Sequence, residues 1–574
     1  MKPSGDFKSR HKLIRISFHS LFFIILLRVT YIQLFPGSED LLSHLANKQY
    51  QSVIELHPYR GTIYDHRYIP LAISIKTPSI AVNPKVFNPS KENRKKLAKL
   101  LDLPEPKIRA LSDKDSYFAW LKRKIPWELS EMIRKMNLKG MHFLSEHSRY
   151  YTGGEDAAHL LGYVGTDNTG LLGLEHSQNM ILKGQATTII SLKDARGEQI
   201  LLNNRDIRPG RSGKNLILTI DRVIQEISEK ALKRAIKKSG SKAGFVLVSD
   251  PHTGRILAMA SRPGFNPNDP GSISMNKTKN LALSWAFEPG STLKPFVIAS
   301  AIEQKLTSPF EIHNCEKSGR LPIDRFNSIH DDHPREFATT EEILIYSSNI
   351  CTFKIAQRLK EEGLYKTLKN FGFSGRSTLI DVPGHVSGYM SPWKKWKPIR
   401  FANISFGQGM LVTGLEVIQA YGAIANGGYL ISPYVIERTE SERGVILDDY
   451  GPAVRQKVLS AETARAVSRI LKKVTEEGTA QKAQMDHYTA AGKTGTAEKP
   501  DPESRAYSKE KRIANFAGFT PANRPHLVIY VVLDEPGNKP YYGGMWAAPA
   551  FREIAQESLQ YLNVEPDKET LSSR

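Results

Sequence analysis

With 574 residues, the chain is too long for one hydrophobic core, which excludes a single-domain protein. Its hydrophobic content of 40% and its charged content of 24% are ordinary for folded domains. The 80 Lys and Arg residues exceed the 59 Asp and Glu residues by 21, but this excess is scattered along the chain and no nucleic-acid motif accompanies it. We therefore expect no nucleic-acid partner and favour an anionic membrane face or cell-wall polymer.

The first 35 residues predict a membrane anchor. A basic tail, residues 1–12, precedes an apolar segment, residues 13–35, that is long enough to span a bilayer. The leading positive charge places the N-terminus in the cytoplasm and the remainder of the chain on the other side of the membrane. A cleaved signal peptide is the alternative, but no small-x-small cleavage site follows the apolar run.

Residues 36–210 are expected to form a separate module. Short strands such as residues 52–56, lysine-rich helices such as residues 91–101 and Gly-rich turns alternate through it.

Residues 211–564 predict a second unit of the α/β (α+β) class, followed by a tail, residues 565–574. Strands at both ends of this unit, with helices inserted between them, indicate an antiparallel sheet flanked by helices. The expected elements are a strand at 215–220, a helix capped by Asp221, a hairpin of 244–249 and 256–260, a mostly helical block from 291 to 480, strands at 488–497, 515–519 and 527–533, and a helix at 549–562.

Ser291-Thr-Leu-Lys294 is the first of three motifs that together indicate a serine acyl-transferase. Ser291 follows a Glu-Pro-Gly turn and precedes a long apolar run, which predicts that the turn delivers it to a helix N-terminus. There Ser291 and Lys294 share one helix face, so a neutral lysine amine can remove the serine proton. The same S-x-x-K spacing occurs without this context at Ser9, Ser239, Ser274, Ser391 and Ser508.

The other two motifs are Ser347-Ser-Asn349 and Lys493-Thr-Gly-Thr496. The first follows a capping box that begins at Thr339 and lies between two helical stretches. Alone it reads as an ordinary turn or helix cap. The second lies on a predicted strand whose glycines indicate that a ligand or another backbone segment approaches the strand closely. It is the only Lys-Thr-Gly in the chain. Lys493 is a second cation that would help to keep Lys294 neutral.

The two cysteines predict neither a disulfide framework nor a metal site. We expect Cys351 to be a small packed residue of a helix, with pairing to Cys315 as the alternative. His330-Asp-Asp-His333 lacks helical His spacing and a further ligand cluster, so we expect a polar loop there rather than a metal site. No cofactor is expected.

With these motifs, the chain resembles the class B penicillin-binding proteins over nearly its whole length. Arg60-Gly-Thr-Ile-Tyr-Asp65 matches the early R-G-x-I-x-D segment of that family. At Thr413-Gly-Leu-Glu416 the chain departs from the family's usual Thr-Pro-Leu-Gln, and Asp65-His-Arg-Tyr68 departs from its Asp-Arg-x-Gly. Further similar segments are 149–151, 162–164, 173–175, 407–409 and 426–428.

The resemblance implies a D,D-transpeptidase that cross-links peptidoglycan stem peptides and is acylated by β-lactams. In such an enzyme Ser291 is the nucleophile that attacks the D-Ala-D-Ala carbonyl, and Lys294 is its base. Ser347 relays a proton to the leaving D-alanine.

The remaining motif residues are implied to bind the substrate. Asn349 holds the donor peptide, and Lys493 supplies positive potential. Thr494 and Thr496 meet the terminal carboxylate, while the backbone N–H groups of Ser291 and Thr496 form the oxyanion hole.

The resemblance also implies a place in the cell and a set of partners. Residues 36–210 match the non-catalytic pedestal, so the protein is expected to work with a separate SEDS-family glycosyltransferase and other divisome membrane proteins. It would be a single-pass protein of the bacterial inner (cytoplasmic) membrane with its catalytic domain on the extracytoplasmic side. Segments 287–292 and 541–549 favour the division (FtsI-like) branch.

Several alternatives remain open. An elongation-type class B transpeptidase fits the same motifs, and a membrane-anchored, non-catalytic β-lactam-binding scaffold or sensor would use the site for binding alone. A β-lactamase or a D,D-carboxypeptidase would share the motifs, but neither is expected to have the N-terminal module.

Overall fold

The computed structural model describes residues 5–34, 51–56, 58–116, 118–193, 199–200, 207–208, 210–375, 382–500 and 507–568. The chain divides into two compact units. The smaller unit comprises Met1–Pro58 and Gln185–Arg211, and the larger comprises Tyr59–Gly184 and Ser212–Arg574.

The smaller unit begins with helix α1 (Gly5–Leu34). Its stretch Ser9–Gln33 is long and apolar enough to cross a membrane, as a single-pass anchor requires. The predicted basic tail is thus helical from Gly5 onward. In the same unit β1 (Gln51–Leu56) confirms the strand predicted at 52–56 and pairs with β6 (Thr187–Lys193), which also pairs with β7 (Gln199–Ile200) and β8 (Ile207–Arg208).

The larger unit is built on a five-stranded sheet whose neighbouring strands are all antiparallel, as the sequence predicted. The hairpin and the late strands expected from the sequence are its members. Their order is β11 (Ile256–Arg262), β10 (Ala243–Ser249), β24 (Leu527–Asp534), β23 (Tyr507–Thr520) and β22 (Ala491–Pro500). Strand β22 therefore lies at an edge of this sheet.

Helices cover both faces of this sheet. Helix α9 (Arg222–Ser239) starts where predicted, because the Asp221 carboxylate accepts hydrogen bonds from the N–H groups of its first turn. On β10, a Cβ at Gly244 would contact Leu232 of α9, whereas the next residue, Phe245, contacts Gly414 of α15 (Gly414–Ala425). Successive strand residues face opposite sides, so α9 and α15 lie on opposite faces.

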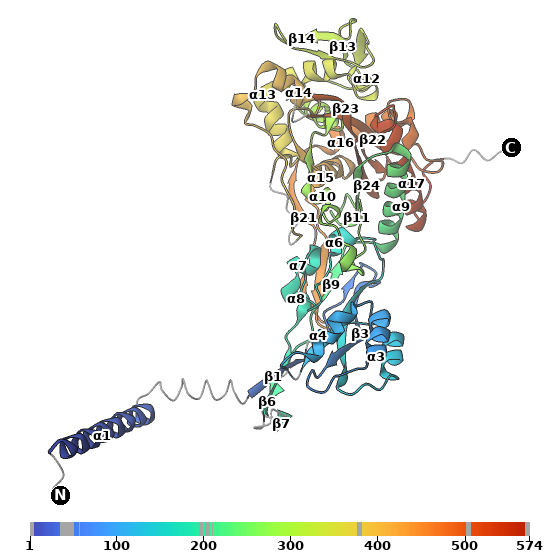
Figure 1. The fold of residues 1–574 in the computed structure, drawn as a ribbon. Coiled ribbons are helices and arrows are strands. Elements are labelled where there is room, and N and C mark those ends of the chain that lie inside the picture. The colour runs from blue at the N-terminus through green and yellow to red at the C-terminus, as the bar shows by residue number, and fades with distance from the viewer. Residues whose placement is uncertain are drawn as a thin grey trace. The chain divides into compact units, whose positions relative to one another are not determined.

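The last helix, α17 (Gly543–Tyr561), packs beside α9 (Figure 1) and begins six residues before the predicted start at 549, so that Pro549 lies inside it. Its start is set by a close approach. A Cβ at Gly543 would lie 2.2 Å from the carbonyl oxygen of Asn515 and 2.5 Å from that of Gly495, so only glycine fits against these strands.

Thr413-Gly-Leu-Glu416, which departs from the usual family pattern, opens α15 with a complete capping box. The Glu416 carboxylate accepts hydrogen bonds from the backbone N–H groups of Thr413 and Gly388. Burial raises the pKa of Glu416 to about 7.

The block from 291 to 480 is mainly helical, as predicted, but it also contains short antiparallel strand pairs that the sequence did not predict. Its helices are α11 (Lys294–Glu303), α12 (Thr340–Ile345), α13 (Asn349–Asn370), α14 (Pro398–Ser405), α15 and α16 (Ala461–Glu476). The pairs are β13 (Ile312–Asn314) with β16 (Phe337–Thr339), β14 (Arg320–Pro322) with β15 (Ser328–His330), and β18 (Tyr429–Ser432) with β21 (Ala453–Lys457).

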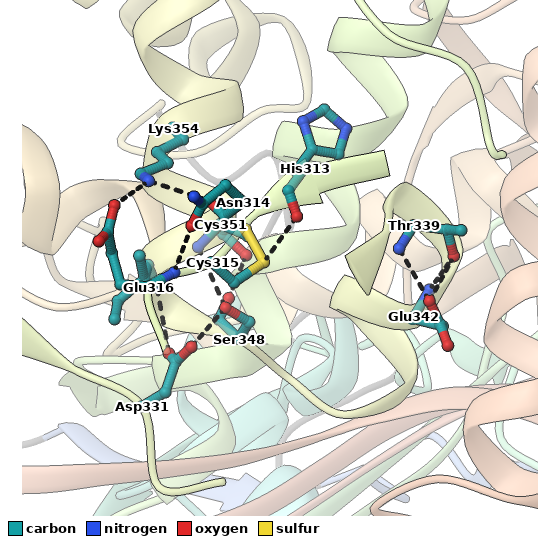
Figure 2. Close-up of a disulfide and its surroundings, with 12 residues drawn as sticks. His313, Asn314, Cys315, Glu316, Asp331, Thr339, Glu342, Ser348, Cys351 and Lys354 are labelled. Carbon is teal, nitrogen blue, oxygen red and sulfur yellow. Dashed lines mark hydrogen bonds and ion pairs between the residues drawn. A yellow bond between two sulfur atoms is a disulfide. The ribbon is translucent and has the colours of Figure 1, made fainter. Parts of the chain in front are cut away.

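Cys315 and Cys351 form a disulfide (Figure 2), so the expectation that Cys351 is only a packed helix residue was wrong. The Cα atoms lie 5.1 Å apart, within the usual range for a disulfide. Cys315 follows β13, and Cys351 lies in the first turn of α13. The folding of the segment between them brings the two together, and the sequence pattern gives no sign of that proximity.

The N-terminal part of the larger unit, Tyr59–Gly184, has its own apolar core, which includes Ile80, Leu97, Ile108 and Ile133. The helix predicted at 91–101 is α3 (Lys91–Leu101). The other elements are β2 (Ile63–Tyr64), β3 (Pro70–Val82), α4 (Glu105–Ser112), β4 (Ala119–Lys122), α5 (Trp127–Arg134), β5 (Met141–Tyr151), α6 (Ala158–Leu161), α7 (Gly173–Ser177) and α8 (Asn179–Lys183).

A seven-stranded sheet joins this part to residues far along the chain. Its order is β20 (Ile446–Asp449), β19 (Ile436–Glu440), β9 (Asn215–Leu218), β2, β3 and β4, with β5 also paired to β3. Strand β2 is parallel to β9, while β19 pairs antiparallel to β9 from the other side. One sheet thus contains strands from both sides of residue 210.

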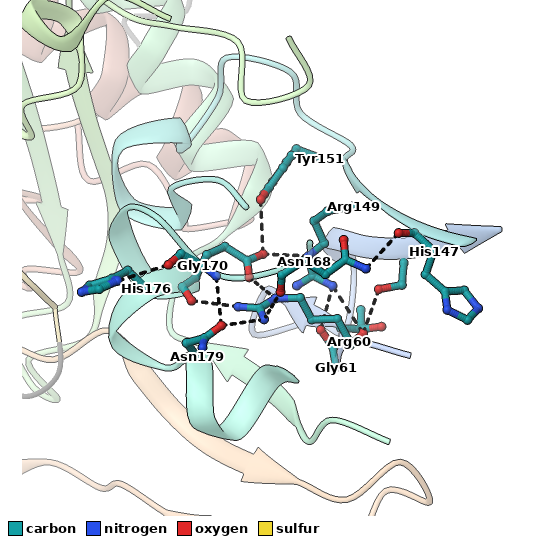
Figure 3. Close-up of polar contacts among 12 residues, drawn as sticks. Arg60, Gly61, His147, Arg149, Tyr151, Asn168, Gly170, His176 and Asn179 are labelled. Atoms are coloured by element: carbon teal, nitrogen blue, oxygen red, sulfur yellow. Dashed lines mark hydrogen bonds and ion pairs between the residues drawn. The ribbon is translucent and has the colours of Figure 1, made fainter. Parts of the chain in front are cut away.

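Three segments that resemble the family meet in one buried ion cluster (Figure 3). Arg60 Nε lies 2.5 Å from one Glu175 oxygen, and Arg149 Nε lies 2.7 Å from the other. Arg60 also donates to Asn179 Oδ1 and to the carbonyl of Asn168, so its buried guanidinium is well satisfied. Because all three charged side chains are buried, the cluster holds these three chain segments together.

Candidate active site

A cavity of about 730 Å³ brings residues of all three sequence motifs together. Ser291 lines it from the turn before α11, Ser347 and Asn349 from the junction of α12 and α13, and Thr494 and Thr496 from β22. The two motif lysines, Lys294 and Lys493, are fully buried beneath this surface. All seven predicted site residues thus lie on or directly behind one surface.

Ser291 is delivered by a turn that only glycine permits. Gly290 has a φ of +60°, and a Cβ there would lie 2.6 Å from the carbonyl oxygen of Thr496 on β22. A short 3-10 turn, Gly290–Leu293, leads directly into α11. The predicted helix start is confirmed, and the close approach at Gly290 holds Ser291 beside the edge strand.

Lys294 is the chemically unusual group of the site. Its Nζ donates to the carbonyl oxygen of Ser347 at 2.5 Å, to Ser347 Oγ at 3.1 Å and to Asn349 Oδ1 at 2.7 Å. Burial lowers its pKa to about 7, although the charges of Asp331 and Asp332 oppose this effect. The amine is therefore partly neutral at neutral pH, as a general base must be.

Ser347 occupies a strained backbone conformation. Its φ is +64°, in the left-handed region that residues with a side chain rarely adopt. The helix before it, α12, opens with the predicted capping box of Thr339 and Glu342. The next residue, Ser348, caps α13 by accepting a hydrogen bond from the N–H of Cys351. Ser347 is the middle one of three residues between the two capped helices and the only one of the three with a positive φ, and its carbonyl accepts a hydrogen bond from Lys294.

Lys493 lies on β22 with long hydrogen bonds to Thr479 and Thr494, between 3.4 and 3.5 Å. Burial and the charge of Lys294 hold its pKa well below the ordinary lysine value. The sequence predicted that Lys493 would help to keep Lys294 neutral. The effect in the structure runs the other way: burial lowers the pKa of Lys294, and the charge of Lys294 lowers the pKa of Lys493.

Two further polar residues lie at the site and were not predicted from the sequence, Thr479 and Asp331. Thr479 lines the cavity, and its hydroxyl lies 2.8 Å from that of Thr494. Asp331 belongs to the His330-Asp-Asp-His333 segment, which was predicted to be a polar loop. Its carboxylate accepts hydrogen bonds from the N–H groups of Asn349 and Ile350 and from the Ser348 hydroxyl. A cap supplied from another segment leaves no local sequence signal.

Within the described ranges, no group of three or more His, Cys, Asp or Glu side chains could hold a metal ion.

Known proteins match this chain over most of its length. Residues 55–218 match the penicillin-binding protein dimerisation domain, and residues 244–556 match the penicillin binding protein transpeptidase domain. The chain is 32% identical to Stage V sporulation protein D of Bacillus subtilis over 96% of this chain and 86% of that protein. It is 29% identical to the peptidoglycan D,D-transpeptidase FtsI of Escherichia coli over 95% of this chain and 91% of that protein.

The fold is also found in solved structures. Penicillin binding protein 3 of Mycobacterium tuberculosis, complexed with aztreonam, superposes with a TM-score of 0.70 and 27% sequence identity. The match covers 90% of this chain and 98% of that one. With its dimerisation domain followed by a transpeptidase domain, the chain belongs to the class B penicillin-binding proteins, as the sequence motifs predicted.

Proposed function

We propose that this penicillin-binding protein is a peptidoglycan D,D-transpeptidase that works through an acyl-enzyme on Ser291. The observation that carries the proposal is Lys294. It is a fully buried amine with a pKa of about 7, one helical turn from Ser291, and it is hydrogen-bonded to Ser347 and Asn349 at a 730 Å³ cavity.

In the acylation step the neutral amine of Lys294 accepts the proton of Ser291 Oγ as this oxygen attacks the carbonyl of the donor D-Ala-D-Ala bond. The C–N bond then breaks, and the leaving D-alanine nitrogen takes up a proton. Ser347 Oγ lies 3.1 Å from Lys294 Nζ, so it is placed to relay that proton from the lysine. The product is an ester between the donor peptide and Ser291.

In the second step an acceptor amine attacks the ester, an amide forms, and Ser291 recovers its proton. A β-lactam would enter the same path, but its leaving nitrogen stays attached to the acyl group. The adduct should therefore persist. The solved complexes of penicillin binding protein 3 with aztreonam and with ampicillin are consistent with this expectation.

The remaining motif residues are proposed to bind the donor. Asn349 uses its Oδ1 toward Lys294, which places its side chain at the cavity wall where the donor peptide would pass. Thr494 and Thr496 offer hydroxyls to the terminal carboxylate. Burial and the charge of Lys294 lower the pKa of Lys493. The negative charge of a bound carboxylate would raise this pKa again and favour the charged form of Lys493.

We propose an oxyanion hole formed by the backbone N–H groups of Ser291 and Thr496. The close approach of Gly290 to the Thr496 backbone supports it, because it holds the Ser291 turn against β22. Preorganised donors of this kind stabilise a developing oxyanion by several kcal/mol.

For the cellular role, we propose septal wall synthesis with a SEDS-family glycosyltransferase and other divisome membrane proteins as partners. The alignment with FtsI over 95% of this chain supports the division branch. We further propose that residues 13–35 anchor the chain in the inner membrane with residues 1–12 in the cytoplasm, that 36–210 form the non-catalytic pedestal, and that 211–564 form the extracytoplasmic transpeptidase. Depletion should give filamentous cells, whereas an elongation enzyme would give rounded ones.

The activity is tested by labelling the full-length protein, in detergent micelles, with a fluorescent penicillin. We expect one long-lived covalent adduct on Ser291 and none in Ser291→Ala. Rapid turnover of the antibiotic would show a β-lactamase instead. Complete absence of an adduct would refute the acyl-enzyme. Release of D-alanine from a stem-peptide donor, with and without an acceptor amine, separates transpeptidation from carboxypeptidase activity and from a scaffold that binds β-lactams only.

A further inference from the structure

The segment Ile312–Thr339, which contains β13 to β16, lies against the first turn of α13 and forms one wall of the cavity. Ser347 and Asn349 border the start of that helix. Figure 2 shows the disulfide at this junction together with Asp331 and Ser348. Three contacts between the segment and the helix lie within five residues of Asn349, and a further one joins Arg358 to His313.

The first of these contacts is covalent. Cys351 lies two residues after Asn349 and is bonded to Cys315, and both cysteines are fully buried. Cys315 is itself fixed within the segment, because its N–H donates to the carbonyl oxygen of Glu336 at 2.8 Å. The disulfide therefore joins the base of the segment to the first turn of α13.

The second contact is the cap by Asp331. One carboxylate oxygen accepts from the N–H groups of Asn349 and Ile350, and the other accepts the Ser348 hydroxyl at 2.6 Å. The same hydroxyl accepts the N–H of Cys351 at 3.0 Å, which connects the cap to the disulfide. The neighbouring carbonyl of His330 accepts from Asn349 Nδ2 at 2.7 Å, which leaves Oδ1 of that amide for Lys294.

The third contact, between Lys354 and Glu316, is different in kind. Lys354 Nζ lies 2.5 Å from a Glu316 oxygen and 2.9 Å from the carbonyl of Asn314, at a partly exposed site one turn further along the helix. An ion pair at such a partly exposed site contributes little to the stability of the fold.

Ser347 needs external support because of its backbone. A residue with a side chain in the left-handed region is strained and keeps that conformation only where its surroundings impose it. The Ser347 carbonyl and hydroxyl both accept from Lys294, so relaxation of this residue would move two of the three hydrogen bonds of the base.

We propose that Asp331 and the Cys315–Cys351 disulfide are positioning elements for the reaction: they lock the segment Ile312–Thr339 onto α13 and thereby hold Ser347 and Asn349 in register with Lys294. This inference rests on the proposed acyl-enzyme function. It assigns a catalytic consequence to a disulfide and a carboxylate that touch no reacting atom.

The test compares acylation rates of the full-length protein by a fluorescent penicillin. Cys315→Ala/Cys351→Ala and Asp331→Ala are each expected to lower the second-order rate constant by about 10- to 100-fold, because small displacements of catalytic groups have effects of this size. Asp331→Asn keeps one acceptor oxygen and should recover part of the rate. The matched control is Leu359→Ala, which opens a cavity in the same helix away from the motif.

The pH profile separates positioning from loss of stability. Lys294 faces Asp331, Asp332 and Lys493. Removing the Asp331 charge in Asp331→Asn should move the acidic limb of the acylation profile to lower pH, since a negative charge that favours the ammonium is gone. Wild-type rates in the cysteine variant, or an equal decrease in Leu359→Ala at matched stability, would overturn the proposal. A wild-type protein without any adduct would overturn the proposed function as well.

Discussion

Replacing Lys294 by methionine tests the electrostatic origin of its reactivity. A lysine pKa of about 7 instead of 10.5 corresponds to roughly 5 kcal/mol, at 1.36 kcal/mol per pH unit. In the unfolded chain the lysine keeps its ordinary pKa, so between pH 7 and 10.5 the unfolded state binds a proton that the folded state does not. The free energy of unfolding of the wild type must therefore rise with pH across this window, relative to that of Lys294→Met, by at most roughly 5 kcal/mol.

The same pKa predicts the reaction rate. At pH 7 about half of the Lys294 amines would be neutral, which is on the order of a thousandfold more than for a lysine with its ordinary pKa. The acylation rate should rise through pH 7 and level off above pH 8, and Lys294→Met should form no adduct.

The assay is urea unfolding of both proteins at intervals from pH 6 to 10, alongside stopped-flow acylation over the same range. Lys493→Met serves as a control, because the two lysines share one buried site and the charge of Lys294 lowers the pKa of Lys493. A stability difference between wild type and Lys294→Met that is constant from pH 6 to 10 would show that Lys294 keeps an ordinary pKa, and the reasoning from its burial would be wrong.

Three further substitutions test other parts of the structure. Gly290→Ala places a Cβ 2.6 Å from the Thr496 carbonyl at a φ of +60°, so thermal melting should show a loss of stability and penicillin labelling should slow at least tenfold. Glu175→Gln leaves two buried arginines without their anionic partner. Chemical denaturation should show that the free energy of unfolding decreases by about 3–5 kcal/mol, and an unchanged denaturation midpoint would contradict the ion cluster. Because burial raises the pKa of Glu416 to about 7, its contribution to stability is present below pH 4.5 and is lost as the pH rises to 7. Glu416→Gln, which can keep the capping box, should therefore gain up to about 3 kcal/mol relative to wild type between pH 4.5 and 8, measured by melting at both pH values.

The elements that sequence patterns identify best are those whose determinants are local. The helix capped by Asp221, the helix at 91–101 and the hairpin around residue 250 all form where the sequence predicted them. Their caps, apolar periodicity and turns act over a few residues, so the chain carries the information within the element itself. The start of α17 was placed too late, because a contact of Gly543 with β22 and β23 sets it.

The sequence by itself identified seven side chains that the structure brings together at the candidate site, but neither Thr479 nor Asp331. The three motifs, their order and the turn before Ser291 were sufficient to indicate a serine nucleophile and a lysine base. The tertiary structure alone decided that Lys294 is fully buried, that Asp331 caps the second motif, and that Cys315 pairs with Cys351. It also placed β19 beside β9 in a sheet with β2. These features depend on segments that are distant in the chain, and the depressed pKa of Lys294 is a property of the desolvation that their packing creates.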